Sequence, residues 1–102
     1  MAIYDLVISN GHTVTEIEKK KQDVGIKDGK IAALGEDLEK GAREIDATNK
    51  LILPGGIDAH CHIEQKSSSG IMTADDFYSG SVSAAFGGTT TILPFAAQHR
   101  GQ

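Results

Sequence analysis

Residues 55–65 read GGIDAHCHIEQ, an apolar stretch that ends with two histidines one residue apart. Its small and β-branched residues predict a β-strand over residues 56–63. Side chains alternate between the two faces of a strand, so Asp58, His60 and His62 share one face. The other face is apolar and suits packing against a helix: Ile57, Ala59, Cys61 and Ile63.

Two interpretations of the histidine pair are open from the residues alone. The pair is either hydrogen-bonded on a wet or edge face of the strand, or it binds a metal ion. Polar side chains buried without partners would cost roughly 1–3 kcal/mol each. Imidazole nitrogens suit Zn²⁺ and other transition metals, and ligand sites in parallel α/β folds lie at the carboxyl ends of strands. Spacing and position favour the metal but leave the hydrogen-bonded alternative open.

The residues after this strand predict a polar loop, a helix and a second strand. Thr73 is predicted to cap the helix, with Asp76 three positions on as in a capping box. One helical face is apolar, with Tyr78, Val82, Ala85 and Phe86, and two glycines end the helix. The β-branched run at residues 89–95 predicts a buried strand. Together these elements predict a βαβ unit.

The first half of the chain predicts short strands joined by glycine turns. Asn10-Gly11 and Asp28-Gly29 are two-residue hairpin signals, because these residues tolerate positive φ. Strands are predicted at residues 3–9 and 12–15, on both sides of Asp28-Gly29 within 23–35, at 43–46 and at 50–53. The cluster of Lys19, Lys20 and Lys21 follows two glutamates and is predicted to be a solvated turn. The change of pattern at Pro54 predicts a domain boundary.

Composition limits the classes of protein that fit. The chain has 102 residues, which is enough for one small domain or part of a larger one. With 39% hydrophobic and 24% charged residues, a packed core is expected. The net charge of −4 disfavours nucleic acid and anionic membranes as partners. The single cysteine, and the lack of a secretory signal or a long apolar run, predict a cytoplasmic protein.

The motif PGGIDAHCHIEQ resembles the first barrel strand of the cyclic amidohydrolases, in the branch of the dihydropyrimidinases and hydantoinases, whose pattern is PGGxDxHxH. TADDFYSGSVSAAFGGTTTILPF, at residues 73–95, is similar to the helix and strand that follow in that branch. The stretches YDLVISNGHTVT, DVGIKDGKIAALG and EIDATNKLILPGG resemble its first β-sandwich strands. Asn49 departs from the glycine of many relatives, but both residues tolerate positive φ.

This resemblance implies a mixed α/β fold in two parts. Residues 1–54 would form a portion of an N-terminal β-sandwich. Residues 55–102 would form the start of the metal-dependent hydrolase barrel, namely the first β-α-β unit of a (β/α)8 TIM-type barrel, incomplete in this chain. One such unit cannot close a barrel.

The resemblance also implies a function, which is ring opening of dihydropyrimidines or hydantoins by a metal-dependent hydrolase. His60 and His62 would be ligands of the more buried ion in a site of two divalent ions, expected to be zinc. The family completes that site with residues of later strands, so no catalytic residue is expected in this chain. The isolated chain is accordingly expected to be inactive. A small cyclic amide substrate and a homo-oligomer are implied as partners.

Further candidates surround the histidine pair. Asp58 either orients a ligand histidine or makes a hydrogen bond to the backbone at the strand end. Glu64 and Gln65 are substrate-side candidates, because in the family the loop after the first strand borders the substrate pocket. His99 is another substrate-side candidate, with a plain surface role as the alternative. Cys61, on the opposite face, is expected to be an inert thiol.

Two other functions stay open. A dihydroorotase- or allantoinase-like hydrolase would differ only in its substrate. A non-enzymatic β-rich fragment would instead associate with another chain, because unpaired strand edges readily pair.

Overall fold

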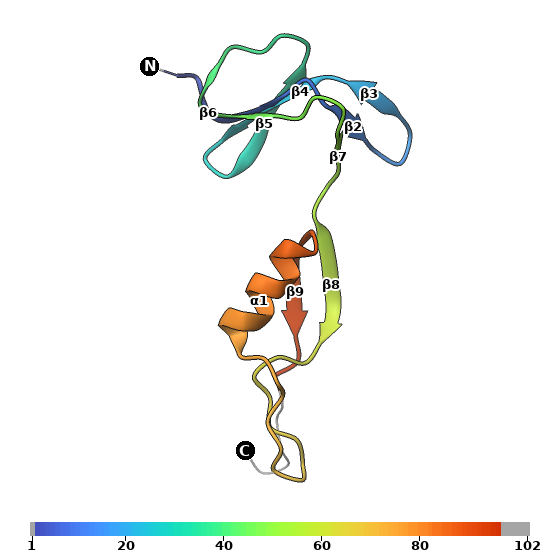
Figure 1. The fold of residues 1–102 in the computed structure, drawn as a ribbon, viewed down its shortest axis with the longest axis vertical. Coiled ribbons are helices and arrows are strands. Elements are labelled where there is room, and N and C mark those ends of the chain that lie inside the picture. Colours follow the sequence, from blue (N-terminus) through green and yellow to red (C-terminus); the bar gives the residue numbers. More distant parts are fainter. Residues whose placement is uncertain (1, 97–102) are drawn as a thin grey trace. The chain divides into compact units, whose positions relative to one another are not determined.

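The structure is a computed structural model that describes residues 2–96 of the chain. The chain divides into two compact units, Met1–Pro54 and Gly55–Gln102. The division falls within the PGG motif, between its proline and its first glycine. Figure 1 shows strands in the first unit, and in the second unit a helix beside two neighbouring strands.

Two small sheets form the first unit. The four-stranded sheet has the order β5-β4-β1-β6, in which β1 runs antiparallel to β4 and parallel to β6. Its strands are β1 (Tyr4–Ser9), β4 (Asp23–Lys27), β5 (Lys30–Gly35) and β6 (Gly41–Asp46). The three-stranded sheet has the order β3-β2-β7, with β2 (His12–Val14), β3 (Lys19–Lys21) and β7 (Leu51–Ile52). The predicted strands are therefore present, with shorter bounds in β2 and β7.

Only one of the two hairpin signals is a hairpin. Asp28 and Gly29 have φ values of 52° and 74° and join β4 to β5, as predicted. The prediction for Asn10-Gly11 was wrong, because β1 pairs with β4 and β6 and not with β2. Asn10 does have a positive φ of 67°, but there it passes the chain from one sheet to the other. A Cβ on Gly11 would lie 2.7 Å from Ile52 Cδ1, so the glycine permits a close approach.

The lysine cluster is also not a turn. Lys19–Lys21 form β3, which pairs antiparallel with β2 at the edge of the smaller sheet. All three lysines are exposed, so their charges stay solvated as predicted while their backbone joins the ladder. Charged residues suit an edge strand because they discourage further pairing.

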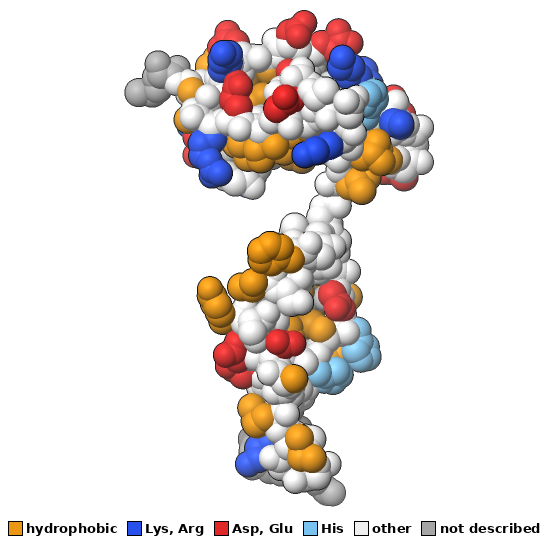
Figure 2. All heavy atoms as spheres, viewed as in Figure 1, with side chains coloured by type: hydrophobic (Ala, Val, Ile, Leu, Met, Phe, Trp, Pro, Cys, Tyr) orange, Lys and Arg blue, Asp and Glu red, His pale blue; other side chains and the backbone are white. Residues whose placement is uncertain are grey.

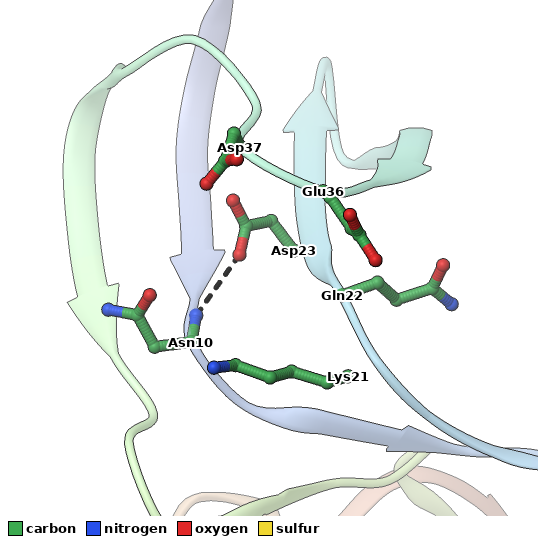
Figure 3. Close-up of a pocket in the computed structure, with 6 residues that line it drawn as sticks. All are labelled: Asn10, Lys21, Gln22, Asp23, Glu36 and Asp37. Carbon is green, nitrogen blue, oxygen red and sulfur yellow. Dashed lines mark hydrogen bonds between the residues drawn. The ribbon is translucent and has the colours of Figure 1, made fainter.

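A small core holds the first unit together. Val7, Val24 and Ala47 are its buried hydrophobic residues. Asp23 is buried beside them, and its two carboxylate oxygens accept hydrogen bonds from the backbone N–H groups of Asn10 and Leu38, at 3.0 and 3.1 Å. Figure 3 shows Asp23 in the polar cavity of about 270 Å³ that lies next to these contacts. The left-handed φ of Asn49, 62°, agrees with the expectation for that position.

The second unit is a βαβ unit, as the sequence predicts. β8 (Gly56–Cys61) and β9 (Thr89–Pro94) run parallel, and α1 (Phe77–Phe86) connects them. In the register of the two strands, Cys61 lies opposite Pro94. The carboxyl ends of both strands therefore meet at one edge (Figure 1).

The helix begins later than predicted. Asp76, not Thr73, is the N-cap, and its carboxylate accepts a hydrogen bond from Ser79 N at 2.7 Å. Ser79 Oγ accepts from Asp76 N in return, which completes a capping box one turn further along the chain. Thr73 instead bonds to Gln65 in the preceding loop. Gly87 is the C-cap and Gly88 has a φ of 88°, so the glycine pair ends the helix as predicted.

The packing of this unit differs from the expectation. Tyr78 and Phe86, on the predicted apolar face of α1, are exposed, whereas Gly80 and Ala84 are partly buried. The residues of β9 are partly or fully exposed, so this strand is not buried. On the apolar face of β8, Ile57 is 69% exposed. The reason is that residues 55–96 contain one helix and two strands, too little structure to cover both faces of either element.

Candidate metal site

The histidine pair lies at the carboxyl end of β8. His60 is in the strand and His62 follows it, and both side chains are exposed. Their ring centroids lie 5.5 Å apart, with an interplanar angle of 65°. Figure 2 shows histidine side chains on the surface of this unit, open to solvent. The structure thus brings together the two residues that the sequence predicts as metal ligands.

Phe95 contacts both histidine rings. It follows β9, and its backbone N–H donates to Cys61 O at 3.0 Å, which continues the pairing beyond the strand. Its ring centroid lies 4.5 Å from that of His60, edge to face, and 4.9 Å from that of His62, nearly parallel. Sequence reasoning missed this residue. The signal was its place after the second parallel strand, because both carboxyl ends share one edge.

Asp58 uses its carboxylate on the backbone. Its Oδ1 atom accepts a hydrogen bond from His60 N at 3.0 Å. This is one of the two roles expected for Asp58. Cys61, on the other side of the strand, is partly buried.

The other candidates lie in the loop after β8, with one exception. Gln65 Oε1 is 2.6 Å from His62 Nδ1, so Gln65 contacts the histidine pair directly. Glu64 is exposed and has a left-handed φ of 51°, and its N–H donates to Asp75 O. His99 lies outside the described residues.

A cavity of about 530 Å³ opens beside His62 and is mainly apolar. His62 and Gln65 line one part of it, and Ile71 and Met72 of the same loop line another. Ser67 accepts from Ile71 N through its hydroxyl and donates its own backbone N–H to Ile71 O, which closes the loop tip. The cavity thus places an apolar surface next to the imidazole of His62.

The donor set fits part of a metal site. Across residues 2–96, no three His, Cys, Asp or Glu side chains come together as a group able to hold a metal ion. The two imidazoles are neighbours and accessible, and a neutral imidazole is a suitable ligand for zinc. Two ligands are fewer than the three or four that protein zinc sites use.

Within residues 2–96, no helix has the length and apolar character needed to cross a membrane.

Two parallel strands joined by a helix are the unit from which α/β folds are built, and ligand sites in those folds lie at the carboxyl ends of the strands. No family model matches the chain. Individual proteins do. D-hydantoinase of Geobacillus stearothermophilus is 47% identical over 97 residues, which cover 94% of this chain and 20% of that protein. Dihydropyrimidinase of Rattus norvegicus is 41% identical over 102 residues, covering 94% and 20% respectively.

Solved structures agree with the sequence matches. A D-hydantoinase structure superposes with a TM-score of 0.88 at 46% identity, over 96% of this chain and 21% of that one. N-acyl-D-glutamate deacylase from Bordetella bronchiseptica, solved with zinc and a phosphonate inhibitor, has a TM-score of 0.56 at 34% identity, over 60% of this chain and 14% of that one. Allantoinases also match, at 40–41% identity.

This chain is the N-terminal segment of a hydantoinase-like cyclic amidohydrolase. It spans about a fifth of the length of the curated relatives that it matches. That family is metal-dependent.

Proposed function

We propose that this chain supplies the first part of a metal-dependent hydrolase that opens the ring of a small cyclic amide. The observation that carries the proposal is the pair of neighbouring, accessible imidazoles at the carboxyl end of β8. Matches to hydantoinases and dihydropyrimidinases over nearly the whole chain support it.

The same comparison supports a proposed architecture. Residues 1–54, with their two small sheets, would be a portion of an N-terminal β-sandwich. Residues 55–102 would begin a (β/α)8 barrel, with β8 and β9 as its first two strands. In such barrels the active site lies at the carboxyl ends of the strands, which is where His60 and His62 lie.

His60 and His62 would hold a divalent ion through ring nitrogens, and zinc is the proposed ion. The zinc-containing deacylase among the structural neighbours supports that choice, and a second ion would need ligands from other parts of the protein. When bound, such an ion polarises an amide carbonyl and makes water a stronger nucleophile near neutral pH. The two histidines of this chain would bind and orient the ion, and Asp58 would fix the backbone at His60.

The cavity beside His62 would take the part of the substrate that does not react. Its apolar lining suits a hydrocarbon substituent of a cyclic amide. Glu64 lies at the start of the same loop and stays a substrate-side candidate, as does His99. The homo-oligomer and the cytoplasmic location stay predictions.

Metal content and hydrolysis test the proposal in the natural protein that carries this sequence. The purified protein should contain zinc in stoichiometric amount and open hydantoin or dihydrouracil rings. Both the zinc and the activity should be lost in His60→Ala and in His62→Ala. His12→Ala is the matched control, because His12 lies in β2 of the other unit, and it should keep both.

Other outcomes decide between the alternatives. If the protein opens allantoin or dihydroorotate but neither hydantoin nor dihydrouracil, the proposed hydrolase activity stands and the proposed substrate is wrong. A protein with no metal and no ring-opening activity would refute the proposal and favour a β-rich segment that associates with another chain.

A further inference from the structure

The ring of His62 has a fixed hydrogen-bond partner. Gln65 Oε1 lies 2.6 Å from His62 Nδ1. With the Gln65 amide in this orientation its oxygen can only accept, so the contact is a hydrogen bond when the neutral imidazole carries its hydrogen on Nδ1. His62 Nε2 then keeps its lone pair, which is the state that a metal ligand requires.

The backbone of Gln65 is held on both sides by one residue. Gln65 N donates to Thr73 Oγ1 at 3.1 Å, and Thr73 N donates to Gln65 O at 3.0 Å. The Thr73 hydroxyl also donates to Asp75 O, which in turn accepts from Glu64 N. These bonds close the neck of the loop next to the N-cap of α1. The backbone of Gln65 is therefore held by the residues that directly precede the helix.

Phe95 restricts the same ring from another direction. Its phenyl ring is nearly parallel to the His62 imidazole, with an interplanar angle of 9°. The stacked phenyl ring limits tilting of the imidazole plane. The hydrogen bond to Gln65 limits rotation of the imidazole within that plane. Together the two contacts fix the plane and the direction of His62.

The two histidines are not equivalent in this respect. The carboxylate next to His60, that of Asp58, bonds to the His60 backbone and not to its ring. Within residues 2–96 the structure shows no hydrogen bond to the His60 imidazole. The ring of His62 thus has a side-chain partner in the absence of a metal, whereas none is seen for the ring of His60 within the same residues.

We propose that Gln65 is a positioning residue that fixes His62 as the Nδ1–H tautomer and so presents Nε2 to the metal. This role differs from the substrate-side role that the sequence suggested for Gln65. The inference rests on the proposed function, because it assigns a metal ion to His62.

The first test reads the tautomer directly, in the metal-free natural protein labelled with ¹⁵N at its histidines. The ring signals of His62 are assigned with His62→Ala. We expect the Nδ1–H form in the parent and in Ser68→Ala, a control that lies in the same loop. Gln65→Leu should shift His62 toward the Nε2–H form, and Gln65→Glu, which restores an acceptor, should reverse the shift. An Nε2–H form in the parent, or no change in Gln65→Leu, would overturn the inference.

The second test measures zinc affinity by competition with a chelator. Loss of a partner that orients a ligand histidine typically weakens metal binding by about 10–100-fold, and we expect that loss in Gln65→Leu. Gln65→Glu and Ser68→Ala should bind zinc like the parent.

The two levels of the proposal fail in different ways. Zinc binding that is lost in His62→Ala but unchanged in Gln65→Leu would overturn the role of Gln65 and leave the proposed function standing. Absence of zinc from the parent would overturn the proposed function and the metal role of His62, while the ring signals would still decide whether Gln65 sets the tautomer.

Discussion

The phenyl ring of Phe95 lies flat against the imidazole of His62, with ring centroids 4.9 Å apart and ring planes 9° from parallel. The two residues come from the ends of different strands, 33 positions apart in the chain. Parallel pairing of β8 and β9 is what makes the contact possible, because it places both strand ends at one edge. The geometry of the candidate site thus depends on the fold of the whole βαβ unit.

Replacement of Phe95 by leucine should weaken metal binding without removing it. Leucine keeps apolar bulk beside the histidines but cannot stack on them. Aromatic pairs contribute about 0.5–1.5 kcal/mol beyond their buried area, which corresponds to roughly 2–10-fold in affinity. Zinc titration of Phe95→Leu in the natural protein measures the effect.

The matched control for that variant is Phe77→Leu. Phe77 is 49% exposed and Phe95 is 48% exposed, so the two substitutions remove similar surfaces. Phe77 lies in α1 and should not affect zinc affinity. Equal affinities of Phe95→Leu and the parent would show that the stacked ring does not position His62.

The two glycines of the PGG motif should respond differently to alanine. A Cβ on Gly55 would overlap the Thr90 side chain, whereas a Cβ on Gly56 would find its nearest atom at 3.5 Å. Overpacking of this kind costs about 1–3 kcal/mol, so Gly55→Ala should lower the unfolding free energy by that amount. Gly56→Ala should change it by less than about 0.5 kcal/mol.

Denaturant unfolding of both variants measures the difference, and Thr90→Ala provides the test of mechanism. Thr90→Ala removes the two Thr90 atoms nearest to the added Cβ, so the double variant Gly55→Ala/Thr90→Ala should recover part of the loss. Additive effects of the two substitutions would rule out the overlap as the cause.

Sequence patterns were sufficient for the βαβ unit and for the pairing of the histidines. The loop, helix and β-branched run after β8 have distinct periodicities. The alternation predicted for residues 56–63 correctly paired His60 with His62, although β8 ends at Cys61 and His62 lies just beyond it. Residue patterns alone did not show the contacts of Phe95 or of Gln65 with the histidines. The contacts of Phe95 depend on the parallel pairing of β8 and β9, and the position of Gln65 depends on the two bonds to Thr73 within the loop.

Local turn signals were less reliable because they describe conformation and not pairing. Asn10 and Asp28 both have positive φ, as their residue types predict, yet only Asp28 lies in a hairpin turn. Whether a turn closes a hairpin depends on where the next strand finds its partner. The helix start shows the same limit, because Thr73 and Asp76 both suit an N-cap and Thr73 is engaged by Gln65.

The Asp76 cap should make the start of α1 sensitive to acid. A hydrogen bond from the Ser79 backbone is the largest cause that lowers the pKa of Asp76 below its ordinary value of 3.8. A carboxyl group with a lowered pKa stabilises the folded state above its ordinary pKa. That contribution is lost as the pH falls through the lower pKa of the folded state.

Hydrogen exchange of the Ser79 amide measures this local effect as a function of pH. Protection in the parent should fall in the range below pH 3.8, relative to Asp76→Asn. Asparagine keeps an acceptor oxygen but does not titrate, so its profile should show only the intrinsic pH dependence of exchange. Identical profiles in the two proteins would mean that the charge on Asp76 does not stabilise the cap.

Asp23 should be the most sensitive polar position of the first unit. Its buried carboxylate accepts from the backbone N–H groups of Asn10 and Leu38, and so ties the corner after β1 to the turn after β5. Asp23→Ala would leave both donors without this partner, at a cost of about 1–3 kcal/mol. Asp23→Asn keeps one acceptor oxygen, so its unfolding free energy should fall between those of Asp23→Ala and the parent.

Glu36→Ala is the control, because Glu36 lines the same cavity (Figure 3) but is exposed. Its unfolding free energy should stay within about 0.5 kcal/mol of that of the parent. Chemical denaturation orders the four proteins, and equal losses for Asp23→Ala and Glu36→Ala would show that the two hydrogen bonds do not hold the corner in place.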